Sequence, residues 1–414
     1  MTNQLELPTI VLASNLWRTA FALALFCVLT MVTTQSAQAQ TLTVLHNFTG
    51  DSDGAYPQST LIADRAGNFY GTTYSGGLGV GTVFKLSHRG SGWVLTPLYA
   101  FRNHDGADPQ LGLIFGPDGT LYGTTSLGGD TGFGVIYNLR PPPTACKSVS
   151  CPWTETVLYN FQGMNDSIDP TGALTFDQSG NLYGTAFGSD FSDKRPPSYS
   201  SGSVWELVHS GGTWTLNVLF DFTSGNGVNP SGGVIFDQAG NLYGTTYNGG
   251  DGGTGTVFEL TPSQSGWTDQ TLHIFGSMGD APMAGLTADH AGNLYGATYV
   301  TGYAFELMPS GGGWNFNTIS ELTGDIGPSS NLTIDSQGNL YGANLESGPA
   351  RQGNIFKLSQ SGGVWTYTNL YTFTGGSDGG IPVGGVTLDA NGNIYGTAAG
   401  GGAYGYGTVW ELTP

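Results

Sequence analysis

The stretch DQAGNLYGTT at residues 237–246 recurs with small changes seven times along the chain. Its tyrosine falls at Tyr70, Tyr122, Tyr183, Tyr243, Tyr295, Tyr341 and Tyr395, roughly 50 residues apart. In an extended segment, Leu242 and Tyr243 point to opposite faces, so both faces carry large side chains. Such a strand indicates a sheet that is covered by other sheets on both sides.

Three further segments accompany each copy. One precedes it, follows a proline and ends in Asp, as at residues 232–237, and another follows it as GTVFEL at residues 255–260. The last opens with Trp and closes with Leu-x-x-Phe, as at residues 365–373. Four short strands in each of seven repeats are typical of a β-propeller. We therefore predict an all-β, seven-bladed propeller with four antiparallel strands per blade, formed as a single domain by residues 41–414.

The two ends of this region predict how the ring closes. Residues 41–48 resemble a fourth strand that lacks the preceding three. The chain ends with the first three strand types, at about 384–389, 393–398 and 407–412, and has no fourth after them. We expect the N-terminal strand to complete the last blade, because this pairing removes two open sheet edges.

Composition supports a folded chain and excludes some partners. Gly accounts for 69 of 414 residues, but aromatics are 12% and charged residues only 10%. Disordered chains show the opposite balance, so the glycines indicate turns. The net charge of −19 argues against nucleic acids and anionic membranes as partners, since both would be repelled.

Residues 1–39 have the pattern of a secretory signal peptide. An apolar run at residues 19–34 follows Arg18 and leads to Ala37-Gln38-Ala39, a small-x-small cleavage pattern. The run is shorter than the ~20 residues that usually span a bilayer, which makes an uncleaved anchor the alternative. We expect a protein secreted to the periplasm or the extracellular medium, with no membrane attachment after cleavage.

Cleavage would leave two cysteines, Cys146 and Cys151. A pair this close in an oxidising compartment is expected to form a local disulfide. A zinc site would need two further ligands, and no nearby His or Cys offers them.

The repeated block DxxGNLYGTTxxGGxxGxGTVFEL resembles the GloVer tandem repeat of secreted bacterial proteins, over residues 41–414. The resemblance implies an extracellular or cell-envelope location and no particular activity. The stretch from the proline to Asn-Leu-Tyr is also distantly similar to the NHL repeat of other propellers. That similarity implies the strand order and no function.

The Asp that opens the quoted block recurs in six copies, with Gly116 in the second. A catalytic group is rarely needed six times. We interpret these residues as Asp side chains that cap their own turns, with Gly supplying the positive φ. The six are Asp64, Asp177, Asp237, Asp289, Asp335 and Asp389.

The loops at the opposite face of the ring vary most and form our candidate ligand-binding face. It comprises Asp53, Asp105, Asp108, Phe191, Tyr199, Tyr404 and Tyr406. Exposed aromatics at a channel mouth can stack on sugars or grip a protein; simple loop packing is the alternative. Asp51 and Asp53 suit calcium, although their motif lacks the full ligand series. We expect no cofactor, with calcium as the alternative.

We favour a monomeric, non-catalytic binding or interaction module for an extracellular protein or polysaccharide. On the candidate face only His104, beside Asp105, offers a histidine, and nothing specifies a catalytic triad. One alternative is a metal-dependent hydrolase or lyase that acts at the channel mouth on a carbohydrate or lactone. Another is a purely structural envelope protein.

Overall fold

A computed structural model describes residues 40–110, 112–142, 153–163, 166–188, 201–276, 280–300, 302–322 and 326–414. The chain divides into two compact units, Met1–Thr41 with Pro414, and Leu42–Thr413. The second unit carries the fold discussed below. The expected signal peptide, Cys146, Cys151, Phe191 and Tyr199 lie outside the described residues, so the inferences about them stay predictions.

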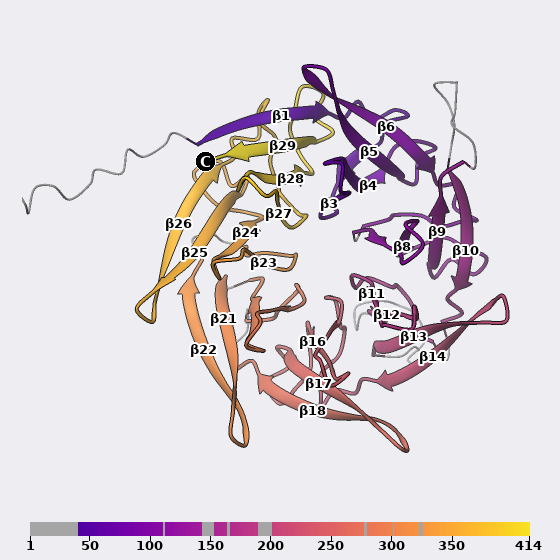
Figure 1. The fold of residues 1–414 in the computed structure, drawn as a ribbon, viewed down its shortest axis with the longest axis vertical. Helices are drawn as coiled ribbons and strands as arrows, with labels where there is room; N and C mark the ends of the chain where they lie inside the picture. The colour runs from indigo at the N-terminus through magenta and orange to yellow at the C-terminus, as the bar shows by residue number, and fades with distance from the viewer. Residues whose placement is uncertain are drawn as a thin grey trace, which may run out of the picture. The chain divides into compact units, whose positions relative to one another are not determined.

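Seven antiparallel sheets are arranged in a ring, which confirms the predicted propeller (Figure 1). The first blade contains β3 (Ile62–Ala63), β4 (Phe69–Ser75), β5 (Thr82–Arg89) and β6 (Gly92–Ala100), with the short β2 (Ala55–Pro57) also pairing with β4. The second contains β7 (Ile114–Phe115), β8 (Leu121–Thr125), β9 (Val135–Arg140) and β10 (Thr154–Asn160). The third contains β11 (Thr175–Phe176), β12 (Leu182–Ala186), β13 (Ser203–Ser210) and β14 (Thr213–Asp221).

The remaining blades repeat this order. The fourth contains β15 (Ile235–Phe236), β16 (Leu242–Thr246), β17 (Thr256–Ser263) and β18 (Gly266–Ile274). The fifth contains β19 (Thr287–Ala288), β20 (Leu294–Ala297), β21 (Tyr303–Ser310) and β22 (Gly313–Glu321). The sixth contains β23 (Thr333–Ile334), β24 (Leu340–Asn344), β25 (Asn354–Ser361) and β26 (Val364–Thr372). The seventh contains β27 (Thr387–Leu388), β28 (Ile394–Ala398), β29 (Thr408–Thr413) and β1 (Thr41–Asn47). Among these described residues no helix forms, and hence none long and apolar enough to cross a membrane.

The ring closes as predicted, with β1 paired to β29. The amide of Phe48 donates to the carbonyl of Gly407 at 3.0 Å, just beyond the paired strands. At the ring axis, the amide of Gly385 in the seventh blade donates to Oγ1 of Thr60 in the first at 2.8 Å. Both bonds join residues from opposite ends of the chain, so the first and last blades are held together.

The hydrophobic core is divided into clusters, one at each junction between neighbouring blades. At the junction of the fourth and fifth blades, Tyr243 and Val257 pack with Leu286, Leu294 and Phe305. Each sheet therefore buries its two faces only when both neighbours are present. This is why strands with bulk on both faces specify a closed ring.

The innermost strands are shorter than expected: β27 covers only Thr387–Leu388, whereas the sequence suggested about 384–389. The reason is crowding at the axis, where a Cβ atom on Gly232 would lie 2.2 Å from the amide nitrogen of Gly285 in the next blade. Backbone groups there bond between blades instead, as when Oγ1 of Thr245 donates to the carbonyl of Ala284 at 2.8 Å.

Candidate functional site

Several acidic residues of the predicted loop face serve to fix the loops themselves. The Asp105 carboxylate is buried and accepts hydrogen bonds from the Tyr99 hydroxyl at 2.6 Å and the Arg102 amide at 2.7 Å. Tyr159 donates in the same way to Asp166, and Tyr371 to Asp378. These carboxylates therefore tie each loop to the end of the preceding outer strand.

Asp53 belongs to the same series, with histidine in place of tyrosine. Nε2 of His46 lies 3.0 Å from its Oδ2, and the amide and hydroxyl of Thr49 donate to the same carboxylate. Asp51, the other acid considered for calcium, is exposed. Over the described ranges, no three His, Cys, Asp or Glu side chains gather closely enough to hold a metal ion.

His104 and Asp108 also have separate surroundings. Nδ1 of His104 lies 3.3 Å from the carbonyl oxygen of Arg102, whereas Asp105 beside it turns inward to Tyr99. Burial raises the pKa of Asp108, and a hydrogen bond from Tyr74 opposes that shift. The structure thus does not bring His104 and these two acids together as one group.

Two predicted aromatics of this face remain accessible. Tyr404 is 61% exposed and Tyr406 is 38% exposed. The Tyr406 ring lies 5.8 Å from that of Tyr56, which adopts a φ of 54°. The loop face therefore keeps an aromatic pair at its surface, while most of its acids are engaged.

The opposite face carries the repeated Asp turns, and their geometry confirms the capping role. Oδ1 of Asp237 accepts from the amides of Ala239 at 2.8 Å and Asn241 at 2.9 Å. Its Oδ2 accepts from the Asn241 side chain at 2.8 Å and the Tyr243 hydroxyl at 3.1 Å. Gly240 has the expected positive φ of 89°. The same four contacts recur at Asp64, Asp177, Asp289, Asp335 and Asp389.

The repeat tyrosines also pack in a regular series across the blade junctions. Tyr70 meets Phe115 of the next blade at 5.3 Å between ring centroids, Tyr122 meets Phe176 at 5.2 Å, and Tyr183 meets Phe236 at 4.9 Å. Each Phe is the second residue of an innermost strand. In the fifth blade the second residue of the innermost strand β19, which would meet Tyr243, is Ala288. A ring is therefore missing at the junction of the fourth and fifth blades.

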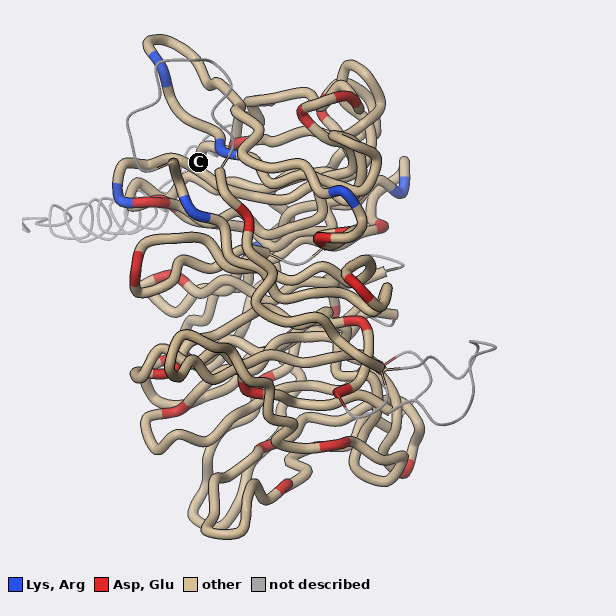
Figure 2. Tube along the Cα trace, turned by 90° about the vertical axis from the view of Figure 1, so that its right-hand side faces the viewer, with Lys and Arg blue, Asp and Glu red and all other residues tan. Residues whose placement is uncertain are grey.

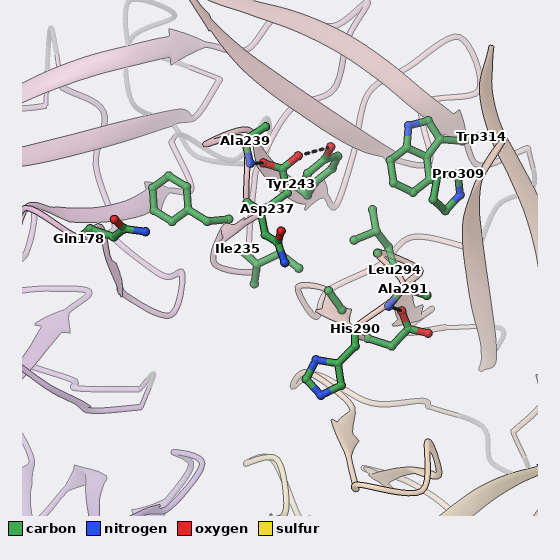
Figure 3. Close-up of a pocket in the computed structure, with 15 residues that line it drawn as sticks. Gln178, Ile235, Asp237, Ala239, Tyr243, His290, Ala291, Leu294, Pro309 and Trp314 are labelled. Carbon is green, nitrogen blue, oxygen red and sulfur yellow. Dashed lines mark hydrogen bonds between the residues drawn. The ribbon is translucent and has the colours of Figure 1, made fainter. Parts of the chain in front are cut away.

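A cavity of about 680 Å³ lies at this junction (Figure 3). Its apolar part includes Ile235 and Tyr243 of the fourth blade and Ala288, Leu294 and Trp314 of the fifth. The Trp314 ring lies 5.6 Å from that of Tyr243 and closes the outer side. We call this cavity the blade 4–5 crevice.

Besides the capping Asp237 and Asp289, three polar side chains border the crevice: Gln178, Gln238 and His290. Each directly follows the capping Asp of its turn, in the third, fourth and fifth blades respectively. All three are exposed, and within the described part of the chain their side chains make no hydrogen bond. They are therefore available to a ligand.

The lining of the crevice includes two carboxylates and neither Lys nor Arg. No Lys or Arg occurs between residues 196 and 350, and Figure 2 shows the Lys and Arg of the described ranges gathered in the other half of the molecule. The carboxylates of Asp237 and Asp289 accept from their own turns. Burial and the carboxylates of Glu259 and Asp237 raise the pKa of Tyr243, so its hydroxyl stays protonated.

The sequence reasoning placed the candidate site on the other face and missed this crevice. The signal was present, because aligning the repeats puts Ala288 where three preceding blades have Phe. The seventh-to-first junction also has an alanine, Ala63, but there Phe69 replaces the usual leucine and fills the gap. An alanine at this position therefore indicates a gap only when the residue paired with it on the next strand is not a larger ring.

A second cavity of about 230 Å³ lies at the ring axis. Its lining includes Thr60, Ser231, Ser330 and Asn331. These groups are used between blades: Ser231 donates to the Met283 carbonyl at 2.8 Å, for example. This cavity is therefore small, and several of the polar side chains that line it hold neighbouring blades together.

Solved structures with a similar fold include virginiamycin B lyase from Staphylococcus aureus, which is 13% identical, with a TM-score of 0.57 over 91% of this chain and 99% of that one. A protein described as the extracellular domain of a hybrid two component system from B. thetaiotaomicron is 15% identical, with a TM-score of 0.51 over 90% of this chain and 41% of that one. At such identities these similarities show the fold alone. No match to a curated protein was found.

The sequence pattern itself identifies the family. The family model of the Gloeobacter/Verrucomicrobia repeat matches residues 29–194 and 148–304, two overlapping stretches that cover more than half of the chain. The chain belongs to the Gloeobacter/Verrucomicrobia repeat family.

Proposed function

We propose that this protein is a secreted, non-catalytic binding module that holds an uncharged ligand in the blade 4–5 crevice. The observation that carries the proposal is Ala288, which stands where three other blades have a packing Phe and beside which a cavity of about 680 Å³ opens. A crevice of this size, lined by polar and apolar surface in nearly equal parts, is large enough to hold a small molecule.

The chemistry of the lining favours binding over catalysis. A hydrolase needs an activated nucleophile or a positioned acid and base. Here the two nearest carboxylates accept hydrogen bonds from their own turns, and His290 is the one histidine among the lining residues. Two amides and one imidazole can orient a ligand without transforming it.

The proposal is tested by refilling the crevice. N-phenyl-1-naphthylamine, a neutral apolar fluorophore, should bind the wild-type protein with increased emission. Ala288→Phe places a ring where Phe115 and Phe236 lie in other blades, and binding should weaken at least tenfold. Ala63→Phe is the matched control, because Phe69 already fills that junction. If the dye does not bind, or binds Ala288→Phe as well as the wild type, the crevice is not the binding site.

A further inference from the structure

We infer that the ligand of the blade 4–5 crevice is a neutral saccharide chain, an inference that rests on the function proposed above. Three features of the crevice lead to this class: its row of two amides and one imidazole, its apolar surface and the absence of Lys and Arg from its lining.

The polar groups form a row along three consecutive blades. Gln178, Gln238 and His290 occupy the same turn position, one residue after the capping Asp, and all three line the crevice. In the other four blades this position holds Arg65, Pro117, Ser336 and Ala390. A glutamine amide both donates and accepts hydrogen bonds. Sugar hydroxyls do the same, so a row of amides suits a row of hydroxyls.

The apolar platform lies beside this row. The partly exposed Trp314 ring lies beside the space opened by Ala288, and the buried side chains of Tyr243 and Leu294 line its inner side (Figure 3). A pyranose ring presents a face of C–H groups that packs on aromatic and aliphatic carbon, while its hydroxyls project from the ring edge. Aromatic side chains supply such contact area at fixed geometry. One sugar ring can therefore occupy the gap left by the missing phenyl ring.

The charge distribution selects among polar ligands. None of the residues that line the crevice is Lys or Arg, so no side chain of these two types is placed there to pair with a carboxylate, sulfate or phosphate. The overall charge of −19 also repels anionic polymers. The carboxylates of Asp237 and Asp289 are committed to their turns, which leaves little to attract a cation. These charges disfavour both anionic and cationic ligands, so we expect a neutral one.

The placement of the row favours a chain over a single sugar. His290 and Ala288 belong to the fifth blade, Gln238 to the fourth and Gln178 to the third. A monosaccharide in the gap beside Ala288 would leave the more distant amide of Gln178 unused. Adjoining sugar units that extend from the gap across the fourth blade would use all three.

Isothermal titration of the wild-type protein with neutral tetrasaccharides tests this inference. Cello-, xylo-, laminari-, malto- and chito-tetraose serve as ligands, and tetragalacturonate as the charged comparison. We expect at least one neutral tetrasaccharide to bind and tetragalacturonate to bind at least tenfold more weakly. Gln178→Ala and Gln238→Ala should each weaken binding about three- to tenfold, the effect of one lost hydrogen bond. Ser336→Ala, at the same turn position outside the crevice, should leave affinity unchanged.

The outcomes separate this inference from the proposed function. If the naphthylamine dye binds in an Ala288-dependent way but no neutral tetrasaccharide does, the crevice is a binding site and the saccharide inference is wrong. It is also wrong if tetragalacturonate binds equally well, or if both glutamine variants keep wild-type affinity. Melting temperatures of all variants establish that they are folded. If a peptide with an exposed apolar side chain competes with the dye instead, the ligand is a protein partner.

Discussion

The rings of Phe69 and Tyr395 lie 4.3 Å apart across the junction between the seventh blade and the first. This contact compensates for Ala63, the second alanine in the series of innermost strands. The fifth blade has Ala288 but keeps the ordinary Leu294 opposite it, so nothing takes the place of the missing ring. In this chain, then, the junction at Ala63 gains a ring from Phe69, whereas the junction at Ala288 has no such replacement on β20.

Filling the crevice should stabilise the fold. Ala288→Phe restores a ring against Tyr243 and adds buried apolar area, so we expect about 1 kcal/mol more stability, as is usual for cavity filling. Urea denaturation followed by tryptophan fluorescence measures the change. Ala63→Phe should gain nothing, because Phe69 already occupies that space. An unchanged or lowered unfolding free energy for Ala288→Phe would show that the crevice does not accept a ring.

Removing one capping carboxylate should destabilise the protein. Asp237→Ala deletes three hydrogen bonds from the turn and a fourth contact from the Tyr243 hydroxyl, whose single proton is shared with Glu259 at 2.9 Å and can go to it fully. We expect a loss of about 2 kcal/mol, less than four independent bonds would give, because the turn is partly open to water. Gln238→Ala in the same turn is the control and should stay within ~0.5 kcal/mol of the wild type. Equal melting temperatures for the two variants would contradict the capping role.

Stability should also depend on pH through Glu155. Burial, together with the nearby charge of Asp105, raises the pKa of Glu155 to about 7, above its ordinary value of 4.5. The folded state therefore binds more protons than the unfolded state between these values, and this residue makes stability fall as pH rises from 4.5 to 7. Glu155→Gln should remove that contribution, so that the variant gains on the wild type at pH 7.5 relative to pH 4.5. Urea titrations at pH 4.5 and pH 7.5 measure the unfolding free energy of both proteins. An equal change in the wild type and the variant between the two pH values would contradict this prediction.

The fold could be predicted because its information is local and repeated. Strands such as Leu242–Thr246, with bulk on both faces, require neighbours on both sides, and the unmatched ends specify how the ring closes. The length of the innermost strands could not be predicted. It depends on how closely Gly232 approaches the next blade, which no single repeat reveals.

The hydrogen bonding within the candidate loop face could not be predicted from the sequence, for a physical reason. Asp105 in its Asp-rich loop looks the same in sequence whether it binds a ligand or accepts a hydrogen bond from Tyr99. The donor lies on the preceding strand, and only the folded loop brings the two together. The crevice was missed because it depends on an absent ring at Ala288, and sequence reasoning weighs the side chains that are present.

Closure of the ring by β1 yields the last prediction. Removing residues 41–48 would leave β29 as an open edge and uncover the core around Phe48, which is fully buried and packs on Phe84 at 5.4 Å between ring centroids. We expect a chain of residues 49–414 to aggregate through that edge, whereas residues 40–414 stay soluble and monomeric. Size-exclusion chromatography with light scattering distinguishes the two, and a synthetic peptide of residues 41–48 should restore monomers by pairing with β29. A truncated chain that stays monomeric and melts at the same temperature as residues 40–414 would show that β1 does not hold the ring closed.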